Sequence, residues 1–494
     1  MLKKIRVILA VLVWLGVTLL FVDFTGVAHA WLGWLAKIQF LPALLALNVG
    51  VVISLVALTL LFGRVYCSVI CPLGIMQDGI AWFGKRVKKN RYRYSPARNI
   101  LRYGMLVIFV IALVAGVGSF VALLAPYSAY GRIAQNLLAP IWGWCNNLLA
   151  AWAEHAESYT FYRTEVWMRA GSTFAIAVIT LVVLAILSYR NGRTWCNTVC
   201  PVGTVLGLLS RFSLFRPVID TSKCNGCGLC GRNCKSACID TKNHTIDLSR
   251  CVACMDCVEK CHKGAISYTY RRTNQVVSAS AAKETDKGRR SFLSATAVVA
   301  AATALKAEEK TVDGGLAEIL DKKKPERKTR IAPPGAVSLR NMAQHCTACQ
   351  LCVAACPNGV LRPSTNLQTL MQPESSYERG YCRPECTKCS EVCPAGAIRP
   401  IALEDKSSIQ IGHAVWVSKN CIPLTDGVEC GNCERHCPVG AIQMVPSDPN
   451  DEHSVKIPVV NEERCIGCGA CENLCPSRPF SAIYVEGHEV HKTV

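Results

Sequence analysis

Two kinds of binding motif are missing from this 494-residue sequence. No G-x-G-x-x-G follows a predicted strand, which argues against dinucleotide binding. No C-x-x-C-H is present, which argues against covalently attached haem. Charged residues make up only 18% of the chain, whereas hydrophobic residues make up 51%, a high share that long apolar runs in the first 190 residues explain.

Acidic residues are fewer than basic residues in the first 330 positions of the chain. Residues 331–494 carry a net charge of −4, so the total of +19 requires +23 on residues 1–330. Basic residues beside apolar spans are typical of the cytoplasmic loops of membrane proteins. Membrane topology therefore explains the positive charge better than nucleic-acid binding does.

Cysteine is present in excess, with 30 residues. The stretch 224–261 contains two runs with the spacing C-x2-C-x2-C-x3-C. This spacing wraps a backbone loop around an iron–sulfur cube, and the fourth cysteine usually binds the sister cluster. Structural zinc and disulfides are the alternatives, but zinc ribbons place their C-x2-C pairs far apart. We therefore predict two [4Fe–4S] clusters in this stretch.

Each of these clusters should take three cysteines from one run and its fourth from the other. The predicted sets are Cys224, Cys227, Cys230 and Cys261 for one cluster and Cys251, Cys254, Cys257 and Cys234 for the other. Cys238 lies four residues after Cys234 and is an alternative crossing ligand.

Four apolar runs precede this unit and predict a helical membrane domain. They cover residues 7–22, 40–62, 103–124 and 172–187. The first run resembles a signal peptide with a cleavage site at 28–30, but its length and the later spans favour an uncleaved helix. The loop 63–102 holds nine Lys or Arg and one acid, Asp78, which predicts that this loop and the N-terminus are cytoplasmic.

A template G-R-x-[Y/W]-C-x3-C-P-x-G occurs twice, 129 residues apart, directly after the second and the fourth run. Such a repeat of helix pairs brings four thiols to one membrane face. We expect these four cysteines to be the catalytic, redox-active group, as thiols or as a metal or cluster site: Cys67, Cys71, Cys196 and Cys200.

The stretch 271–330 is rich in Ala, Ser and Lys and is predicted to be a linker. Within it, Gly288–Leu293 reads G-R-R-S-F-L and precedes a weakly hydrophobic run, as a twin-arginine export signal does. The run at 291–305 is either cleaved or a marginal fifth span.

Four further cysteine motifs follow, each ending in Cys-Pro, and they predict four more clusters. Their cysteines are Cys346, Cys349, Cys352 and Cys356 in motif one, Cys382, Cys386, Cys389 and Cys393 in motif two, Cys421, Cys430, Cys433 and Cys437 in motif three, and Cys465, Cys468, Cys471 and Cys475 in motif four. We expect nested pairing, with motif one beside four and two beside three.

The chain is thus divided into four parts. We predict a four-helix membrane domain at 1–215, a cytoplasmic two-cluster α+β bacterial ferredoxin at 216–270, the linker at 271–330, and a four-cluster ferredoxin unit with little regular secondary structure, on the periplasmic side, at 331–494.

Residues 1–270 resemble the membrane-bound quinol dehydrogenase ferredoxin of periplasmic nitrate reductase systems (NapH), through the spans, the paired template and the two-cluster unit. Residues 288–494 resemble its periplasmic partner (NapG), through R-R-S-F-L, the Ala-Pro-Pro-Gly-Ala before motif one, and the irregular spacing of motifs two and three. The sequence therefore resembles a fusion of the two.

The resemblance implies a relay in the bacterial inner membrane that carries electrons from menaquinol or ubiquinol through six [4Fe–4S] clusters to a periplasmic reductase or cytochrome, without binding nucleic acid. Proton acceptors for the quinol would lie on the outer segments, where the candidates are Asp23, His29, Glu154, His155 and Glu165. The alternative function is an electron or thiol donor for maturation of a metalloenzyme, with the paired C-x3-C-P cysteines as the working groups.

Overall fold

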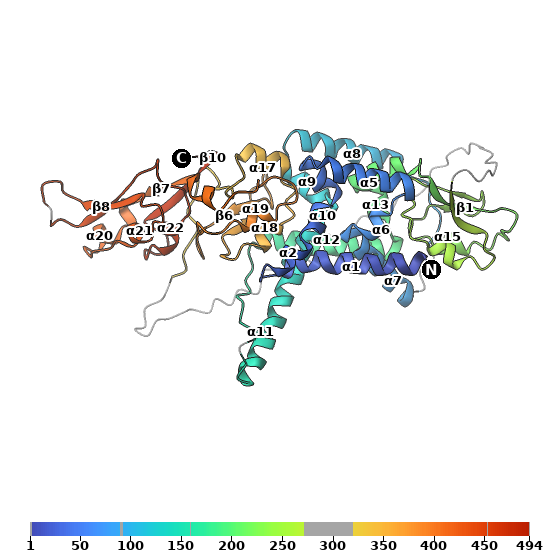
Figure 1. Ribbon diagram of the computed structural model, residues 1–494, viewed down its shortest axis with the longest axis horizontal. Coiled ribbons are helices and arrows are strands. Elements are labelled where there is room, and N and C mark those ends of the chain that lie inside the picture. The colour runs from blue at the N-terminus through green and yellow to red at the C-terminus, as the bar shows by residue number, and fades with distance from the viewer. Residues whose placement is uncertain (1, 89–91, 159, 271–319, 452, 494) are drawn as a thin grey trace, which may run out of the picture.

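The computed structural model describes residues 2–88, 92–158, 160–270, 320–451 and 453–493. Three parts follow one another along the long axis of the molecule (Figure 1). A helical domain lies in the middle, with the first cysteine-rich unit against one end and the C-terminal unit against the other. The predicted export signal and the run 291–305 lie outside the described residues.

Two long apolar helices run through the helical domain. α1 (Leu2–Val22) and α12 (Gly171–Asn191) have 21 residues each, which corresponds to about 32 Å of helix. The hydrocarbon core of a bilayer is about 30 Å thick, so either helix can cross it. Within the described ranges, these two helices meet both the length and the hydropathy of a membrane span.

The two other predicted spans are interrupted. Residues 40–62 form α4 (Phe40–Leu45) and α5 (Val49–Phe62), which separate at Leu47 with a φ of 53°. Residues 103–124 lie in α8 (Asn99–Val114) and α9 (Gly118–Leu124), which separate at Gly116 with a φ of 72°. Left-handed residues of this kind end helices. The structure therefore has two helices capable of crossing a membrane within the described residues, and the other two predicted spans are interrupted.

Both interruptions lie against the C-terminal unit. A Cβ on Gly118 would overlap the side-chain amide of Gln372, and Gly396 lies against Ala46. Irregular backbone is tolerated at membrane depth only where protein covers it. The C-terminal unit contacts the chain at Gly118 and Ala46, whereas Leu47 itself is 79% exposed.

The repeated template folds into two equivalent turns. In each copy an apolar helix is followed by a helix of four or five residues and then by a further helix. The further helix begins at the template proline, because proline is favoured at a helix start. The first copy consists of α5, α6 (Tyr66–Val69) and α7 (Pro72–Lys88), and the second of α12, α13 (Thr194–Thr198) and α14 (Pro201–Ser210).

Short helices close the end of the helical domain that faces the C-terminal unit. They are α2 (Val27–Leu32), α3 (Trp34–Lys37), α10 (Pro126–Ile133) and the π-helix η1 (Ala134–Leu138). α11 (Ala139–His155) continues from η1 and projects sideways from the molecule (Figure 1). The chain returns along it, since Asn146 and Asn147 donate hydrogen bonds to the carbonyl oxygens of Tyr162 and Thr164. We call residues 139–168 the arm.

The first cysteine-rich unit is a small α+β fold, as predicted. The outer strands β1 and β4 pair antiparallel, with Phe215 opposite Tyr270, and the inner strands β2 and β3 form a second ribbon. Its elements are β1 (Phe215–Ile219), α15 (Leu229–Asn233), β2 (Ile239–Asp240), β3 (Thr245–Ile246), α16 (Asp256–Lys260) and β4 (Ile266–Tyr270).

The C-terminal unit joins short helices by three antiparallel strand pairs, β5 with β6, β7 with β10 and β8 with β9. Its elements are α17 (Leu339–His345), α18 (Leu351–Ala354), β5 (Leu361–Pro363), β6 (Pro373–Ser375), α19 (Lys388–Glu391), η3 (Glu404–Ser408), β7 (Ile409–Trp416), η4 (Ser418–Asn420), α20 (Ile422–Thr425), α21 (Asn432–Arg435), β8 (Ile442–Pro446), β9 (Lys456–Val460), α22 (Ala470–Leu474) and β10 (Ile483–Thr493). The last residues of the predicted linker pack on this unit, where Arg327 forms a buried ion pair with Glu472.

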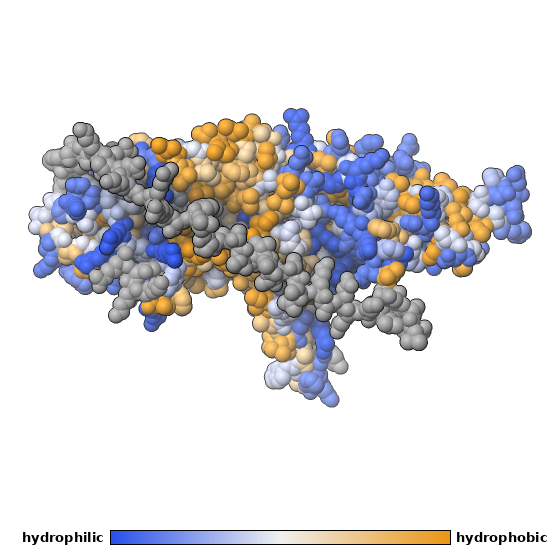
Figure 2. Space-filling model, turned by 180° about the vertical axis from the view of Figure 1, so that it is seen from behind, coloured by the Kyte–Doolittle hydropathy of each residue, from blue (hydrophilic) through white to orange (hydrophobic). Residues whose placement is uncertain are grey.

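Apolar surface gathers over the helical domain, between more hydrophilic surfaces on the two cysteine-rich units (Figure 2). Large side chains on four helices face outward there, including Leu12, Ile53, Ile111 and Ile179 at 60%, 61%, 61% and 56% exposed. Exposed apolar area on this scale marks a membrane or partner surface. Together with the two long helices, it is consistent with a membrane location.

Candidate iron–sulfur and thiol sites

The first unit encloses a cavity of about 140 Å³ between its cysteine loop and the far end of its chain. Its walls include the predicted set of Cys224, Cys227, Cys230 and Cys261. Positive-φ glycines shape the loop, with φ of 67° at Gly226 and 69° at Gly228. The loop therefore curves around empty space lined by four thiols, which fits a cube held by three local cysteines and one distant cysteine.

A second cavity in this unit is lined by five cysteines: Cys234, Cys238, Cys251, Cys254 and Cys257. The Sγ atoms of Cys234 and Cys238 are 3.5 Å apart, and both residues are buried. The structure thus places both candidate crossing ligands at the same site, and each remains a candidate.

The C-terminal motifs pair consecutively, so the expectation of nested pairing is wrong. Cys393 of motif two lies close enough to Cys346, Cys349 and Cys352 to interact with them electrostatically, and Cys356 is similarly close to Cys389. Motifs three and four pair in the same way. One cavity is lined by Cys421, Cys430 and Cys433 of motif three together with Cys475 of motif four.

The physical reason is local chain folding. Motifs one and two share one hydrophobic core with the helical domain, whereas motifs three and four form a separate core with β7, β8 and β10. Each half therefore buries its own two sites, and the halves meet where Cys382 donates a backbone hydrogen bond to the carbonyl oxygen of Cys468.

The described residues contain no group of three His, Cys, Asp or Glu side chains arranged around a single metal ion. A cube holds its ligands further apart, because each thiolate binds a different iron. The thiols that line the cavities fit the ligands of such a cube.

The four template cysteines converge between the two repeats. Cys67, Cys71, Cys196 and Cys200 are each 4–5% exposed, and their mutual electrostatic interactions place them in one group. The structure thus brings together thiols that are 129 residues apart, as the repeat predicted.

Two arginines cross between the repeats in a reciprocal pattern. Arg64 Nη2 donates to the carbonyl oxygen of Cys196 at 3.1 Å and lies 3.7 Å from Cys67 Sγ. Arg193 Nη1 donates to the carbonyl oxygen of Cys67 at 2.8 Å and lies 3.8 Å from Cys196 Sγ. We call the backbone from the first to the second cysteine of each template copy the cysteine turn. Each repeat therefore supplies the arginine that holds the cysteine turn of the other repeat.

The template glycines are required by this packing. A Cβ on Gly74 would overlap the carbonyl oxygen of Cys67, and a Cβ on Gly203 would overlap that of Cys196. Gly63 and Gly192 have φ of 69° and 67°, a conformation that favours glycine and lets the chain turn sharply after each long helix.

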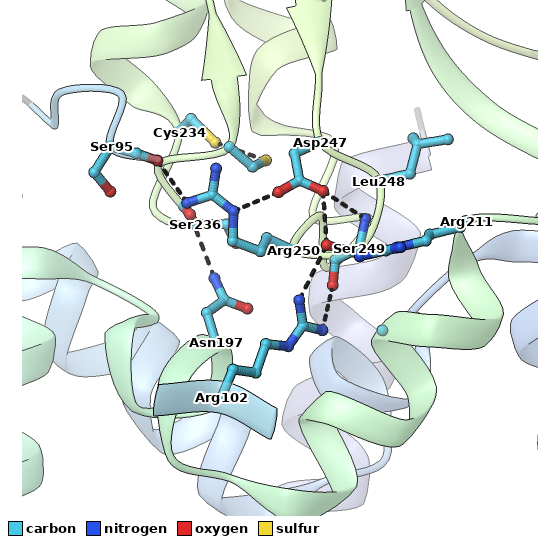
Figure 3. A network of polar contacts seen from close by, with 12 residues as sticks. Ser95, Arg102, Asn197, Arg211, Cys234, Ser236, Asp247, Leu248, Ser249 and Arg250 are labelled. Atoms are coloured by element: carbon cyan, nitrogen blue, oxygen red, sulfur yellow. Dashed lines mark hydrogen bonds and ion pairs between the residues drawn. The ribbon is translucent and has the colours of Figure 1, made fainter. Parts of the chain in front are cut away.

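The thiol group is joined to the first cysteine-rich unit by a network of polar contacts. Arg102 donates to the carbonyl oxygen of Ser249, and Asn197 donates to the carbonyl oxygen of Ser236 (Figure 3). Arg64 donates to the same Ser249 oxygen. The backbone N–H of Arg193 donates to the carbonyl oxygen of Lys235, the residue directly after Cys234. The template cysteines are therefore connected through Arg193 and Lys235, by one hydrogen bond, to the cavity that Cys234 lines.

Asp78 is a functional residue that the sequence showed only as the lone acid of a basic loop. Its carboxylate binds Arg193 at 2.8 Å, Arg6 at 3.0 Å and Lys235 at 3.2 Å. Burial alone would raise its pKa, but Arg193 and Lys235 outweigh that effect and hold the pKa of Asp78 well below its ordinary value. Asp78 thus joins α1, the second copy of the template and the first cysteine-rich unit.

Lys235 also explains why a basic residue stands where proline usually follows the fourth cysteine. Its ammonium group binds Asp256 at 3.1 Å as well as Asp78. Burial would raise the pKa of Asp256, but Lys235 and then Lys3 lower it overall. The first unit is therefore fixed to the helical domain by buried ion pairs.

The candidate proton acceptors lie on the segment that follows α1 and on the arm. Asp23 and Glu165 line a cavity beside the arm, whereas His29, Glu154 and His155 do not line it. Asp23 accepts backbone hydrogen bonds from Thr25, Gly26 and Ala28, so its carboxylate is already used as a helix cap. Glu154 binds Arg163.

Comparisons with known proteins agree with these sites. The family described as "4Fe-4S binding domain" matches residues 44–90 and 173–219, which contain the two template copies. Families described as "4Fe-4S dicluster domain" match residues 247–360, 345–398 and 428–478. The match to 345–398 covers motifs one and two together, in agreement with their pairing in the structure.

Among curated proteins, the chain is 28% identical over 239 residues to the ferredoxin-type protein NapH of Escherichia coli, covering 47% of this chain and 70% of NapH. It is 29% identical over 154 residues to NapG of E. coli, covering 30% of this chain and 66% of NapG. It is 26% identical over 226 residues to the putative electron transport protein YccM of E. coli, but spans only 55% of that protein's length. No solved structure matches.

The fold and the sites thus define a protein with several 4Fe–4S ferredoxin domains. The chain is a homologue of the ferredoxin-type proteins NapH and NapG, as the sequence predicted.

Proposed function

We propose that this protein carries electrons from quinol in the membrane to an acceptor in the periplasm, such as a terminal reductase or a cytochrome. The observation that carries the proposal is the order of the thiol sites. The first unit, the template thiol group and the four C-terminal motifs follow one another along one axis, and apolar helices lie between the ends. Homology to ferredoxin-type proteins supports electron transfer as the activity.

Six [4Fe–4S] clusters held by 24 cysteines would supply one-electron carriers, and the thiol-lined cavities fit them. The fold of the protein determines the order in which these clusters would lie along the molecule. Motifs one and two pack on the helical domain, and the Cys382–Cys468 backbone contact leads to motifs three and four. Near the last site, Leu424 and Val428 are 47% and 58% exposed, which suits a docking surface for the acceptor.

The template thiols would hold one further cluster, shared between the repeats. Cys67, Cys71, Cys196 and Cys200 are the only cysteines in the two matched "4Fe-4S binding domain" segments. Arg64 Nε and Arg193 Nη2 are buried and have no hydrogen-bond partner among the described residues. Unpaired cationic donors beside four thiols fit an anionic group with sulfide acceptors.

The same burial argues against the maturation function. A thiol donor must expose its sulfur to the disulfide or metal of a partner protein. All four template cysteines are 4–5% exposed and are covered by the first cysteine-rich unit, so a partner has no direct access to them. A buried electron relay needs no such access.

In this proposal the first unit is cytoplasmic, the C-terminal unit is periplasmic and the helical domain crosses the bacterial inner membrane. The basic loop 63–102, which packs on the first unit, supports this orientation. Alkaline phosphatase fused after Val494 tests it directly. We expect active phosphatase, and an inactive fusion that is normally expressed would contradict the orientation.

The electron-transfer step is tested with purified protein in detergent. We expect a menaquinol analogue to bleach the visible absorbance of the clusters and to produce the EPR signals of reduced [4Fe–4S] centres. Clusters that are reduced by dithionite but not by any quinol would contradict quinol oxidation.

A further inference from the structure

A cavity of about 490 Å³ lies at the base of the arm, where α1, η1 and α11 meet the C-terminal unit. Its size falls within the ~300–1,000 Å³ that is typical of small-molecule sites. Its walls include six aromatic side chains: Phe21, Phe24, Trp142, Trp144, Trp167 and Phe174. The cavity adjoins the last turn of α1, and therefore the end of a membrane span.

One polar group in this cavity lacks a partner. Gln135 is 8% exposed, and its Oε1 atom accepts no hydrogen bond from any described residue. It stands on the π-helix η1, a conformation that is rare and frequent at functional sites. Leaving a buried amide oxygen unpaired is unfavourable, and a ligand with a hydroxyl donor would supply the missing hydrogen bond.

The C-terminal unit contributes one residue to the wall of the cavity. Ala354 lines the cavity from α18, between Cys352 and Cys356 in the sequence. Arg169 also lines it and donates a hydrogen bond to the carbonyl oxygen of Val353. The cavity is therefore adjacent to motif one, which contributes ligands to both cluster sites of its half.

We propose that this cavity holds the head group of a quinol, with one hydroxyl donating to Gln135 Oε1, and that electrons enter the protein at motif one. The proposal rests on the quinol oxidation proposed above and assigns its site. Both hydroxyl O–H bonds of the quinol break, two protons leave, and two electrons pass singly to the oxidised clusters of motifs one and two, leaving quinone.

The protons have an exit at the rim of the cavity. Glu165 lines the cavity, yet its side chain is 88% exposed and its distance to Arg379 is 4.0 Å, so it can exchange protons with water. Asp23 is less suited because its oxygens cap α2. Trp142 and Trp144 on the arm suit the membrane interface through which a quinol would enter.

Photolabelling of the full chain in detergent tests the location. A photoreactive quinone should crosslink to peptides from 135–144 and 164–169, and free quinone should prevent the crosslinks. Labelling confined to residues around Cys67 and Cys196 would overturn the proposal, as would competition by phospholipid as strong as competition by quinone, which would assign the cavity to a lipid.

Two variants test the roles of the lining residues. Gln135→Leu should weaken quinone binding about tenfold, since one hydrogen bond is lost. It should not lower the unfolding temperature, because it removes an unpartnered buried group. Trp142→Leu should also weaken binding, whereas Trp152→Leu, on the same helix but outside the cavity and 74% exposed, should not.

The possible failures are distinguishable. If quinol reduces no cluster in the unaltered protein, the proposed function fails. If quinol reduces the clusters and Gln135→Leu binds quinone with unchanged affinity, the site assignment fails and the proposed function stands. A lower unfolding temperature in Gln135→Leu would show that the residue has a structural role instead.

Discussion

At the scale of single residues, Asp78 shows how one charge can organise a region. It is the lone acid of the loop 63–102, and it binds three cations that come from α1, from the second repeat and from the first cysteine-rich unit. The sequence identified Asp78 as an isolated acid but did not predict its partners. Arg6, Arg193 and Lys235 are separated from it by 72, 115 and 157 positions.

Asp78→Asn should strongly destabilise the protein. Three buried cations would lose their counter-charge, and breaking a buried ion pair costs about 3–5 kcal/mol. Thermal unfolding followed by cluster absorbance should show a lower midpoint. Glu154→Gln, which breaks the exposed pair with Arg163, should leave the midpoint almost unchanged. Equal effects of the two variants would contradict the role of Asp78.

The template glycines provide a second test at this scale. Gly74→Ala would place a Cβ against the carbonyl oxygen of Cys67 and within 2.6 Å of Arg193 Nη1, so it should separate the repeats and reduce the iron content. Gly79→Ala, on the same helix α7, meets nothing within 4 Å. It should be neutral or stabilise the helix by up to about 1 kcal/mol. Iron loss in both variants would contradict the proposed packing.

At the scale of elements, the two broken helices show a limit of sequence-based prediction. Residues 40–62 and 103–124 have the length and hydropathy of spans, so pattern alone predicts unbroken helices. The breaks at Leu47 and Gly116 lie beside contacts that Ala46 and Gly118 make with Gly396 and Gln372 of the C-terminal unit. Local sequence carries no information about contacts between residues so far apart in the chain. The long helices α1 and α12 have no such contacts at their centres and were predicted correctly.

Three histidines cluster where β10 pairs with β7. His413 Nδ1 and His488 Nε2 are 3.0 Å apart, and His491 is close to His488. Burial, and to a smaller extent the nearby His488, lower the pKa of His491 to about 4. Burial also lowers the pKa of His488, with added effects from His413 and Lys492 that outweigh Glu462.

This cluster predicts acid sensitivity. His491 has an ordinary pKa of 6.5, so between pH 6.5 and about 4 the unfolded chain binds more protons than the folded one. Stability should therefore fall as the pH falls through this window, by on the order of 1 kcal/mol. His491→Gln should reduce the slope of unfolding midpoint against pH, measured from pH 7 to 5. An unchanged slope would contradict this origin of the effect.

At the scale of the whole molecule, cysteine spacing predicted the sites but not all their partners. The repeat predicted that Cys67, Cys71, Cys196 and Cys200 meet, because duplicated helix pairs pack symmetrically. The crossing pattern of the first unit was likewise predicted. Pairing among the four C-terminal motifs was predicted wrongly, because irregular gaps do not say which motif supplies the distant cysteine.

The shared cluster proposed between the repeats can be tested by iron analysis. Replacing both Cys67 and Cys196 by Ser should remove four irons per chain and leave the other clusters in place. Cys145→Ser, at an exposed cysteine on α11, is the matched control and should lose no iron. Full iron content in the double variant would show that the template thiols act without iron.

The crossing of Arg64 and Arg193 has a consequence for any shorter relative. Each half reaches across to the backbone of the other, so neither half satisfies its own cysteine turn. A polypeptide carrying a single helix pair would complete the arrangement only by associating with a second copy through a two-fold axis along the membrane normal. Duplication within one chain makes that association permanent and lets the halves diverge, as Tyr66 and Trp195 at equivalent positions already have.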